Sequence, residues 1–234
     1  MTSIQQRIDQ VRQQIHAAET CYQRAPGSVA LLAVSKTWPL EDILAAARAG
    51  QACFGENYVQ EAVAKIDACP IELEWHFVGH IQSNKSRDIA SRFDWVHSID
   101  RLKLARRLSE QRPDPLAPLN ICLQVNISGE ASKSGLRPDE VLTLAGPISE
   151  LPRLRLRGLM AIPAPMADFA GQRAMFRQVR ELQDRLIAQG LALDTLSMGM
   201  SDDLEAAIAE GATLVRIGTA IFGARDYAKI QRGA

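Results

Sequence analysis

Lys36 ends a short apolar run, LLAVSK, and Pro39 follows three residues later. Lysine is among the side chains that proteins bury least often. A lysine at the end of a buried strand is therefore either a solvated tether or a group with a chemical task. In partly apolar surroundings the pKa of a lysine falls, and its neutral amine can attack an aldehyde to form a Schiff base.

A second set of residues, far along the chain, has the chemistry of an anion site. Ser201 lies in the segment SMGMSDD, and Gly218 and Thr219 follow the run LVRI. Glycine lets backbone N–H groups approach an anion, hydroxyls add hydrogen bonds, and helix N-termini favour negative charge. Taken alone, Ser201 is more typical of a helix cap than of an anion site. Asp202 and Asp203 would repel a phosphate unless their carboxylates point away.

Arg216 stands between Val215 and Ile217 in an apolar run. A buried arginine needs a partner, which is either an internal Asp or Glu or a ligand. An amine on one side of a pocket and anion-binding groups on the other fit a phosphorylated aldehyde. Pyridoxal 5′-phosphate (PLP) is the common one. A phosphorylated sugar held by an aldolase-type lysine is the alternative.

The elements that position these residues alternate between helices and strands. Helical stretches end in glycine, as in EDILAAARAG and LEAAIAEG, and a short apolar run follows. Continuous apolar runs are typical of strands covered on both faces. Helical patterns separate most runs, for example over residues 40–49, 101–111, 139–144 and 169–189. The predicted strands are residues 29–36, 52–55, 75–79, 95–99, 120–126, 156–162, 195–198 and 214–218.

This alternation predicts a parallel sheet with right-handed crossovers. Eight strand–helix units in 234 residues fit a (β/α)8 barrel, in which the chemistry lies where the strands end. An open doubly wound sheet is the alternative, although no G-x-G-x-x-G follows the first strand. No linker divides the chain, so we expect one domain over residues 1–234. The spacing of Ile4, Ile8, Val11 and Ile15 adds an N-terminal helix.

The composition disfavours several classes of protein. Lys plus Arg and Asp plus Glu are 27 each, so the chain lacks the basic excess of a non-specific nucleic-acid binder. No apolar run reaches membrane-spanning length, and the N-terminus lacks the apolar core of a signal peptide. Scattered cysteines without a C-x-x-C pair favour free thiols over disulfides or a zinc site. They are Cys21, Cys53, Cys69 and Cys122. We expect a cytoplasmic, soluble monomer.

Several segments, in order, resemble the YggS/PROSC family of PLP-binding proteins. The match runs from about Leu31 to Tyr227. The resemblance implies a single barrel similar to the N-terminal domain of bacterial alanine racemase, which is fold type III among PLP proteins. The segments are LLAVSKTWP, FGENYVQEAVAKI, WHFVGHIQSNKSR, VNISGEASKSG, LRGLMAIP and LSMGMSDDLEAAIAEGATLVRIGTAIFGARDY.

The resemblance also implies a cofactor-binding role for individual residues. Lys36 carries PLP as a Schiff base, and Arg216 faces the pyridine nitrogen. Asn57 lies by the ring, and Ser197 and His80 are further candidates nearby. No catalytic and no metal-binding residue is implied. The residues that hold the phosphate are Ser201, Gly218 and Thr219.

The function implied by the resemblance is intracellular PLP homeostasis, meaning the binding, buffering and delivery of the cofactor to apo-PLP enzymes. Arg216 supports a role without robust catalysis, because a carboxylate on the ring nitrogen makes PLP a stronger electron sink. Racemisation also needs a second base, which alanine racemase takes from a C-terminal β domain that we do not expect here. A racemase-like enzyme of low activity, using Lys36 with Tyr58 or His80, is the alternative. An aldolase-like sugar-phosphate enzyme is a third hypothesis.

Lys133 is a separate and weaker candidate. It lies in EASKSG, a polar segment after the fifth predicted strand, and so at the same end of the barrel. It either receives PLP transiently on the way out or is simply solvated.

Overall fold

The computed structural model describes residues 2–130 and 134–224, so Lys133 and Tyr227 lie outside the described residues. Eight parallel strands form a closed barrel in chain order, because β8 pairs with β1. The predicted barrel is confirmed, and the open doubly wound sheet is wrong. The strands are β1 (Ala30–Val34), β2 (Cys53–Glu56), β3 (Glu74–Phe77), β4 (Trp95–Ile99), β5 (Leu119–Val125), β6 (Leu154–Ala161), β7 (Thr195–Ser197) and β8 (Leu214–Ile217).

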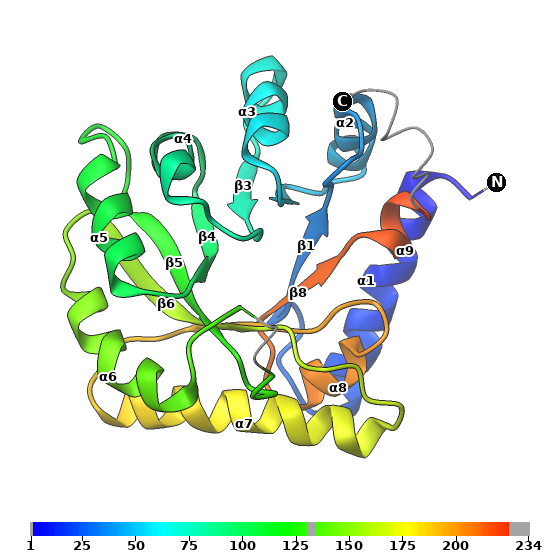
Figure 1. The fold of residues 1–234 in the computed structure, drawn as a ribbon. Coiled ribbons are helices and arrows are strands. Elements are labelled where there is room, and N and C mark those ends of the chain that lie inside the picture. The colour runs from blue at the N-terminus through cyan, green and yellow to red at the C-terminus, as the bar shows by residue number, and fades with distance from the viewer. Residues whose placement is uncertain (1, 131–133, 225–234) are drawn as a thin grey trace.

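Helices surround the strands in chain order (Figure 1). Each predicted helical stretch is present, and the ends differ from the prediction by a few residues. The largest difference concerns the helix predicted over residues 139–144. It begins one residue earlier, with Pro138 in its first turn, and it continues to Ser149. The helices are α1 (Ile4–Cys21), α2 (Leu40–Arg48), α3 (Val59–Ala68), α4 (Ser86–Arg92), α5 (Leu102–Gln111), α6 (Pro138–Ser149), α7 (Phe169–Ala188), α8 (Leu204–Ala209) and α9 (Thr219–Phe222), with a 3-10 turn η1 (Ser83–Lys85).

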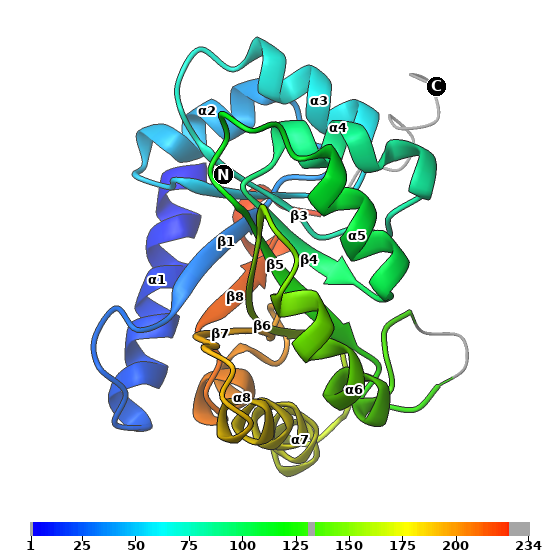
Figure 2. The same cartoon turned by 90° about the vertical axis from the view of Figure 1, so that its left-hand side faces the viewer.

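The predicted N-terminal helix, α1, is confirmed. Ser3 and Gln6 form a reciprocal capping box that satisfies backbone donors at its start. Its apolar face buries Ile8, Val11 and Ile15. The helix contacts α2, α8 and α9, so it covers the side where the first and last strands meet (Figure 2).

The interior of the barrel is partly polar. Trp95, Cys122 and Met160 form a small apolar cluster there, separate from the large core between strands and helices. Branched aliphatic residues usually fill such barrels. Here several buried side chains of the strands are polar, among them His76, His97, Ser197 and Arg216.

All four cysteines are free thiols, as predicted. Over residues 2–130 and 134–224, no helix has the length and apolar character needed to cross a membrane. Cys53, Glu74 and His76 place potential metal-ligand atoms within 4.8 Å of one another. They lie at the beginning of β2 and β3, at the opposite end of the barrel from the predicted site.

Candidate cofactor-binding site

A cavity of about 490 Å³ lies at the carboxyl ends of the strands. Its volume falls within the usual range for small-molecule sites. It brings together six of the residues that the sequence predicts, although they come from widely separated segments. These six are Lys36, Asn57, Ser201, Arg216, Gly218 and Thr219. The lining is completed by Val34, Val78, Ile162, Met200, Asp202 and Ala220.

A sharp turn after β1 sets the position of Lys36. The strand ends at Val34, two residues earlier than predicted, so Lys36 lies in the loop and is half-buried. Thr37 has a left-handed backbone, with φ of 69°, and its N–H donates to Glu61 Oε1 at 2.6 Å. The N–H of Trp38 donates to the carbonyl of Ser35 at 3.1 Å, which closes the turn. Lys36 is therefore held by a structured turn.

A buried ionic cluster lies behind this turn. Glu56 accepts from the Ser35 hydroxyl at 2.7 Å and from Lys65 Nζ at 2.8 Å. Lys65 Nζ also reaches Glu61 Oε1 at 2.5 Å and the carbonyl of Ser35 at 3.0 Å. Burial raises the pKa of the Glu56 carboxyl, and the nearby Lys65 ammonium only partly opposes this. The cluster is joined to the Lys36 turn through Ser35 and through the hydrogen bond from Thr37 to Glu61.

Arg216 forms one wall of the cavity and is 5% exposed. Nη1 donates to the carbonyl and the hydroxyl of Ser197, at 2.6 and 2.8 Å, and Nη2 donates to the carbonyl of Ala161 at 2.9 Å. None of these three acceptors is a carboxylate. Burial lowers the pKa of Arg216 to about 10, so the guanidinium is charged at neutral pH. These bonds use three of the five N–H groups of an arginine, and the others remain for a ligand.

Small residues and a helix start also line the cavity. The helix α9 begins at Thr219, and the first N–H groups of a helix have no partner within it. A Cβ on Gly218 would lie 3.1 Å from the carbonyl of Val34, so glycine allows this close approach. Asp203 Oδ1 accepts from the N–H of Met200 at 2.6 Å, which ties this carboxylate to its own loop. Asp202 lines the cavity and still opposes an anion there.

Two predicted residues do not line this cavity. Ser197 is fully buried behind Arg216 and acts on the site through that side chain. His80 is exposed and lines a neighbouring cavity of about 280 Å³, which shares Asn57, Val78 and Ile162 with the first. His80 is therefore adjacent to the site but does not form its wall.

Asn57 provides a test of whether the residues fit PLP. Its Oδ1 is buried and has no hydrogen-bond partner, a costly state that a donor from a ligand would relieve. Asn57 is close to the end of β3, because a Cβ on Gly79 would lie 2.3 Å from its carbonyl oxygen. A cavity with a lysine, a charged arginine, an anion-binding edge and an unsatisfied acceptor fits PLP.

Sequence analysis missed the polar residues that lie behind the cavity. The sequence assigns no role to Lys65, and it places His76 and His97 within predicted strands without identifying their partners. The available signal was their position: His76 is two residues after Glu74 in β3, so both side chains point to the same face of the strand. That spacing places them on one face of the strand but does not indicate their partners.

Comparisons with known proteins agree with this geometry. The family profile described as "Alanine racemase, N-terminal domain" matches residues 7–226. The chain is 59% identical, over 228 residues, to the pyridoxal phosphate homeostasis protein of Pseudomonas aeruginosa, and the match covers 97% of this chain and 98% of that one.

Two solved structures extend the comparison. The structure of PipY from Synechococcus elongatus with PLP bound has a TM-score of 0.82 and 38% identity, and the match covers 94% of this chain and all of that one (100%). An alanine racemase of Clostridium difficile has a TM-score of 0.71 and 14% identity; the match covers 92% of this chain and 56% of the racemase, and it shows the shared fold alone. The chain therefore belongs to the alanine racemase N-terminal domain family and, within it, to the YggS/PROSC group of pyridoxal phosphate homeostasis proteins.

Proposed function

We propose that this chain binds PLP in the 490 Å³ cavity as a Schiff base with Lys36, buffers it, and delivers it to apo-PLP enzymes. The observation that carries the proposal is the convergence of Lys36, Arg216 and an anion-binding edge on one cavity. The PLP bound to PipY and the names of the close relatives support the same ligand.

Each group in the site has a defined task. Bound PLP supplies an electrophilic aldehyde and a conjugated ring. Lys36 supplies the amine, and Arg216 directs N–H groups to the ring nitrogen, which favours the unprotonated ring. Asn57 accepts a hydrogen bond at the side of the ring. The phosphate is held by Ser201, Gly218 and Thr219.

The composition of the cavity wall supports a carrier over an enzyme. Tyr58, the sequence candidate for a second base, is 55% exposed and does not line the cavity. His80, the other candidate, lines the neighbouring cavity. Among the described residues that line the cavity, Asp202 is the one carboxylate, whereas an aldolase-type reaction needs an acid–base pair beside the lysine. The low-activity racemase remains the alternative.

Two measurements distinguish the carrier hypothesis from the racemase hypothesis: transfer of PLP to an apo-enzyme, and exchange of the α-proton of amino acids. PLP-loaded protein is mixed with an apo-PLP enzyme, and recovery of that enzyme's activity is compared with recovery in the same concentration of free PLP. In parallel, exchange of the α-proton of amino acids is followed in D₂O. A carrier restores the acceptor and gives no exchange above free PLP. Exchange that scales with the protein and disappears in Lys36→Ala would favour the racemase instead.

The transfer assay also tests Lys133. If Lys133 receives PLP on its way out, Lys133→Ala slows recovery of the acceptor while PLP affinity is unchanged. Equal transfer rates for Lys133→Ala and the parent chain would show that this lysine has no part in delivery.

A further inference from the structure

A continuous chain of buried hydrogen bonds crosses the barrel from the cavity to its opposite end. Arg216 donates to the Ser197 hydroxyl at 2.8 Å, and that hydroxyl is 2.8 Å from His97 Nδ1. His97 Nε2 lies 2.8 Å from His76 Nδ1, and His76 Nε2 lies 2.7 Å from Glu74 Oε1. We call these five residues the interior chain. It links the cavity wall to a carboxylate that is 46% exposed at the beginning of β3.

The direction of every hydrogen bond follows from the Glu74 end. An ionised carboxylate only accepts, so His76 Nε2 carries a hydrogen and donates it. In a neutral imidazole the other nitrogen then accepts, so His97 Nε2 donates to His76 Nδ1. The same rule makes His97 Nδ1 an acceptor, and the Ser197 hydroxyl must donate to it. Arg216 can only donate, so it completes the series without conflict.

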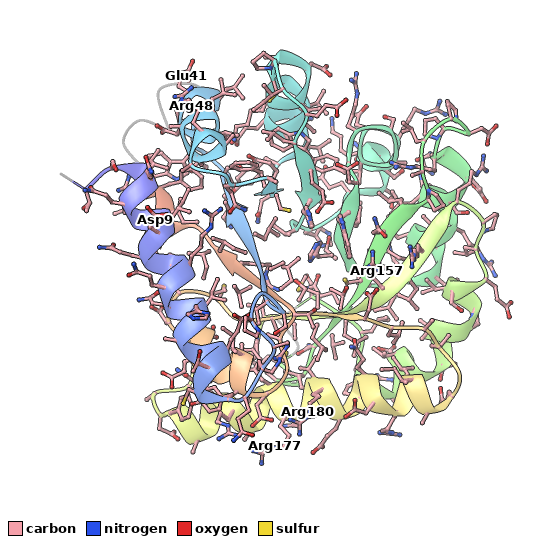
Figure 3. All side chains as sticks on the ribbon, turned by 180° about the vertical axis from the view of Figure 1, so that it is seen from behind. Asp9, Glu41, Arg48, Arg157, Arg177 and Arg180 are labelled. Atoms are coloured by element: carbon pink, nitrogen blue, oxygen red, sulfur yellow. The ribbon has the colours of Figure 1, made fainter. Side chains whose placement is uncertain are left out.

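The surroundings keep both histidines neutral. Burial lowers the pKa of His97, and the positive charge of Arg216 lowers it further. Burial also lowers the pKa of His76, although Glu74 opposes that shift. The Trp95 ring stacks on His76 with centroids 5.3 Å apart, and the Arg157 guanidinium lies 4.7 Å from the centre of the Trp95 ring. Figure 3 shows Arg157 beside the strands, on the side away from the helix α1.

The other titratable groups near this end leave the assignment unchanged. Cys53 Sγ donates to the same oxygen, Glu74 Oε1, at 3.3 Å, and burial raises the pKa of the thiol to about 12. Asp94 accepts from the backbone N–H of Trp75. Hydrogen bonding from His76 lowers the pKa of Glu74, which keeps its carboxylate ionised.

We propose that His97, His76 and Glu74 are positioning residues for the cofactor, because they fix the direction of the interior chain. The Ser197 hydroxyl is committed to His97, so it presents only acceptor lone pairs to Arg216. This oriented acceptor holds the Arg216 guanidinium at the cavity wall, and the carboxylate that sets the orientation is Glu74 at the far end of the interior chain. This inference rests on the proposed function, since the molecule that Arg216 meets is PLP.

The first experiment determines the hydrogen-bond directions in the interior chain in the absence of PLP. Two-bond ¹H–¹⁵N NMR spectra of the full protein, labelled at histidine, report the tautomer of each ring. We expect neutral Nε2–H tautomers for His76 and His97. Glu74→Gln puts an amide at this end, which can donate or accept, so the fixed direction is lost and Nδ1–H tautomers become populated. The control is Glu72→Gln, an exposed position two residues away.

The second experiment measures the effect on PLP. We expect Glu74→Gln to weaken PLP binding by about twofold to tenfold, the value of one net hydrogen bond, and to shift the visible absorption band. Ser197→Ala cuts the chain between Arg216 and His97 and should have the same effect. Far-UV circular dichroism checks that both variants are folded, and Glu72→Gln leaves affinity and band unchanged.

The outcomes separate this inference from the proposed function. Charged histidines or Nδ1–H tautomers in the parent protein would overturn the inference whether or not PLP binds. So would a parent protein that binds PLP while Glu74→Gln and Ser197→Ala keep the parent affinity and band. Failure of the parent protein to bind PLP would instead refute the proposed function, and the tautomers would still decide the direction of the interior chain.

Discussion

At the residue scale, Lys65 is a buried cation outside the cavity that contacts the turn carrying Lys36. Its ammonium group joins Glu56, Glu61 and the carbonyl of Ser35, next to the turn that presents Lys36. Lys65 and Glu56 are both buried, and Glu56 Oε2 has no partner of its own. The carboxylate therefore depends on Lys65 for its charge compensation.

We predict that Lys65→Met destabilises the fold by about 3–5 kcal/mol, the usual cost of removing one partner of a buried pair. Urea denaturation measures the change, with exposed Lys103→Met as the control. The folded pKa of Glu56 lies above its ordinary 4.5, so its charged form is the unfavourable one in the fold. The difference in unfolding free energy between the parent and Lys65→Met should therefore shrink as the pH falls from neutral toward 4.5, because Glu56 becomes protonated. A deficit that grows on acidification would contradict this assignment.

At the element scale, the ends of neighbouring strands position one another. The turn after β3 contains Gly79, and a Cβ there would lie 2.3 Å from the carbonyl of Asn57 and 2.8 Å from its Cα. No real Cβ tolerates such distances, and the contact is with backbone, so the segment that carries Asn57 would have to move. Only glycine lets the two strand ends meet at the cavity.

Gly79→Ala is accordingly expected to weaken PLP binding by about tenfold or more. The new Cβ would displace Asn57, and Asn57 would then lose its hydrogen bond to PLP. Isothermal titration with PLP gives the affinity. Gly146→Ala in the helix α6 is the matched control, since a Cβ there meets no atom within 4 Å. Equal affinities for the two variants would show that the position of Asn57 does not matter for binding.

The helices α7 and α8 are joined by a second ionic cluster, whose residues do not line the cavity. Arg173, Arg177 and Arg180 all donate to Glu210, which is buried just after α8 ends. Arg177 and Arg180 lie side by side on α7 (Figure 3). Burial raises the pKa of Glu210, but the hydrogen bonds from Arg177 and Arg173 outweigh it, and the net shift is downward.

Glu210→Gln should destabilise the protein by about 2 kcal/mol at neutral pH, since hydrogen bonds to charged groups are lost. Because the folded pKa of Glu210 is below the ordinary 4.5, its contribution is complete above pH 4.5 and is lost as the pH falls through the folded value. Thermal denaturation of the parent, the variant and exposed Asp184→Asn, measured from neutral to acidic pH, checks this. A difference that stays constant on acidification would exclude the carboxylate as its source.

At the scale of the whole molecule, the sequence predicts the barrel well, because its signals are local. Apolar runs mark the strands, glycines follow the helices α2, α7 and α8, and all eight strands lie within a few residues of the predicted positions. Six of the eight predicted site residues line the cavity, because the carboxyl ends of parallel strands meet at one end of the barrel, and their role in binding PLP stays a prediction.

The residues behind the cavity could not be predicted, because their partners depend on the register around the closed barrel. His97 on β4 meets Ser197 on β7, one hundred residues away, only when the sheet closes. The sequence leaves the partner of Arg216 open between a carboxylate and a ligand, whereas its hydrogen-bond acceptors are the Ser197 hydroxyl and the carbonyls of Ser197 and Ala161. His80 directly follows Gly79 after β3, but its side chain is exposed and lines the neighbouring cavity instead.

The most direct measurement is the covalent position of PLP on the protein. The purified chain is loaded with PLP, reduced with borohydride, digested, and analysed by peptide mass spectrometry, with Lys36→Ala treated in parallel. We predict a yellow protein whose visible band is bleached by reduction, and a pyridoxyl group on the peptide that contains Lys36. Lys36→Ala should incorporate none. A protein that stays colourless with added PLP, or a label that lies on another lysine and persists in Lys36→Ala, would contradict the proposed Schiff base.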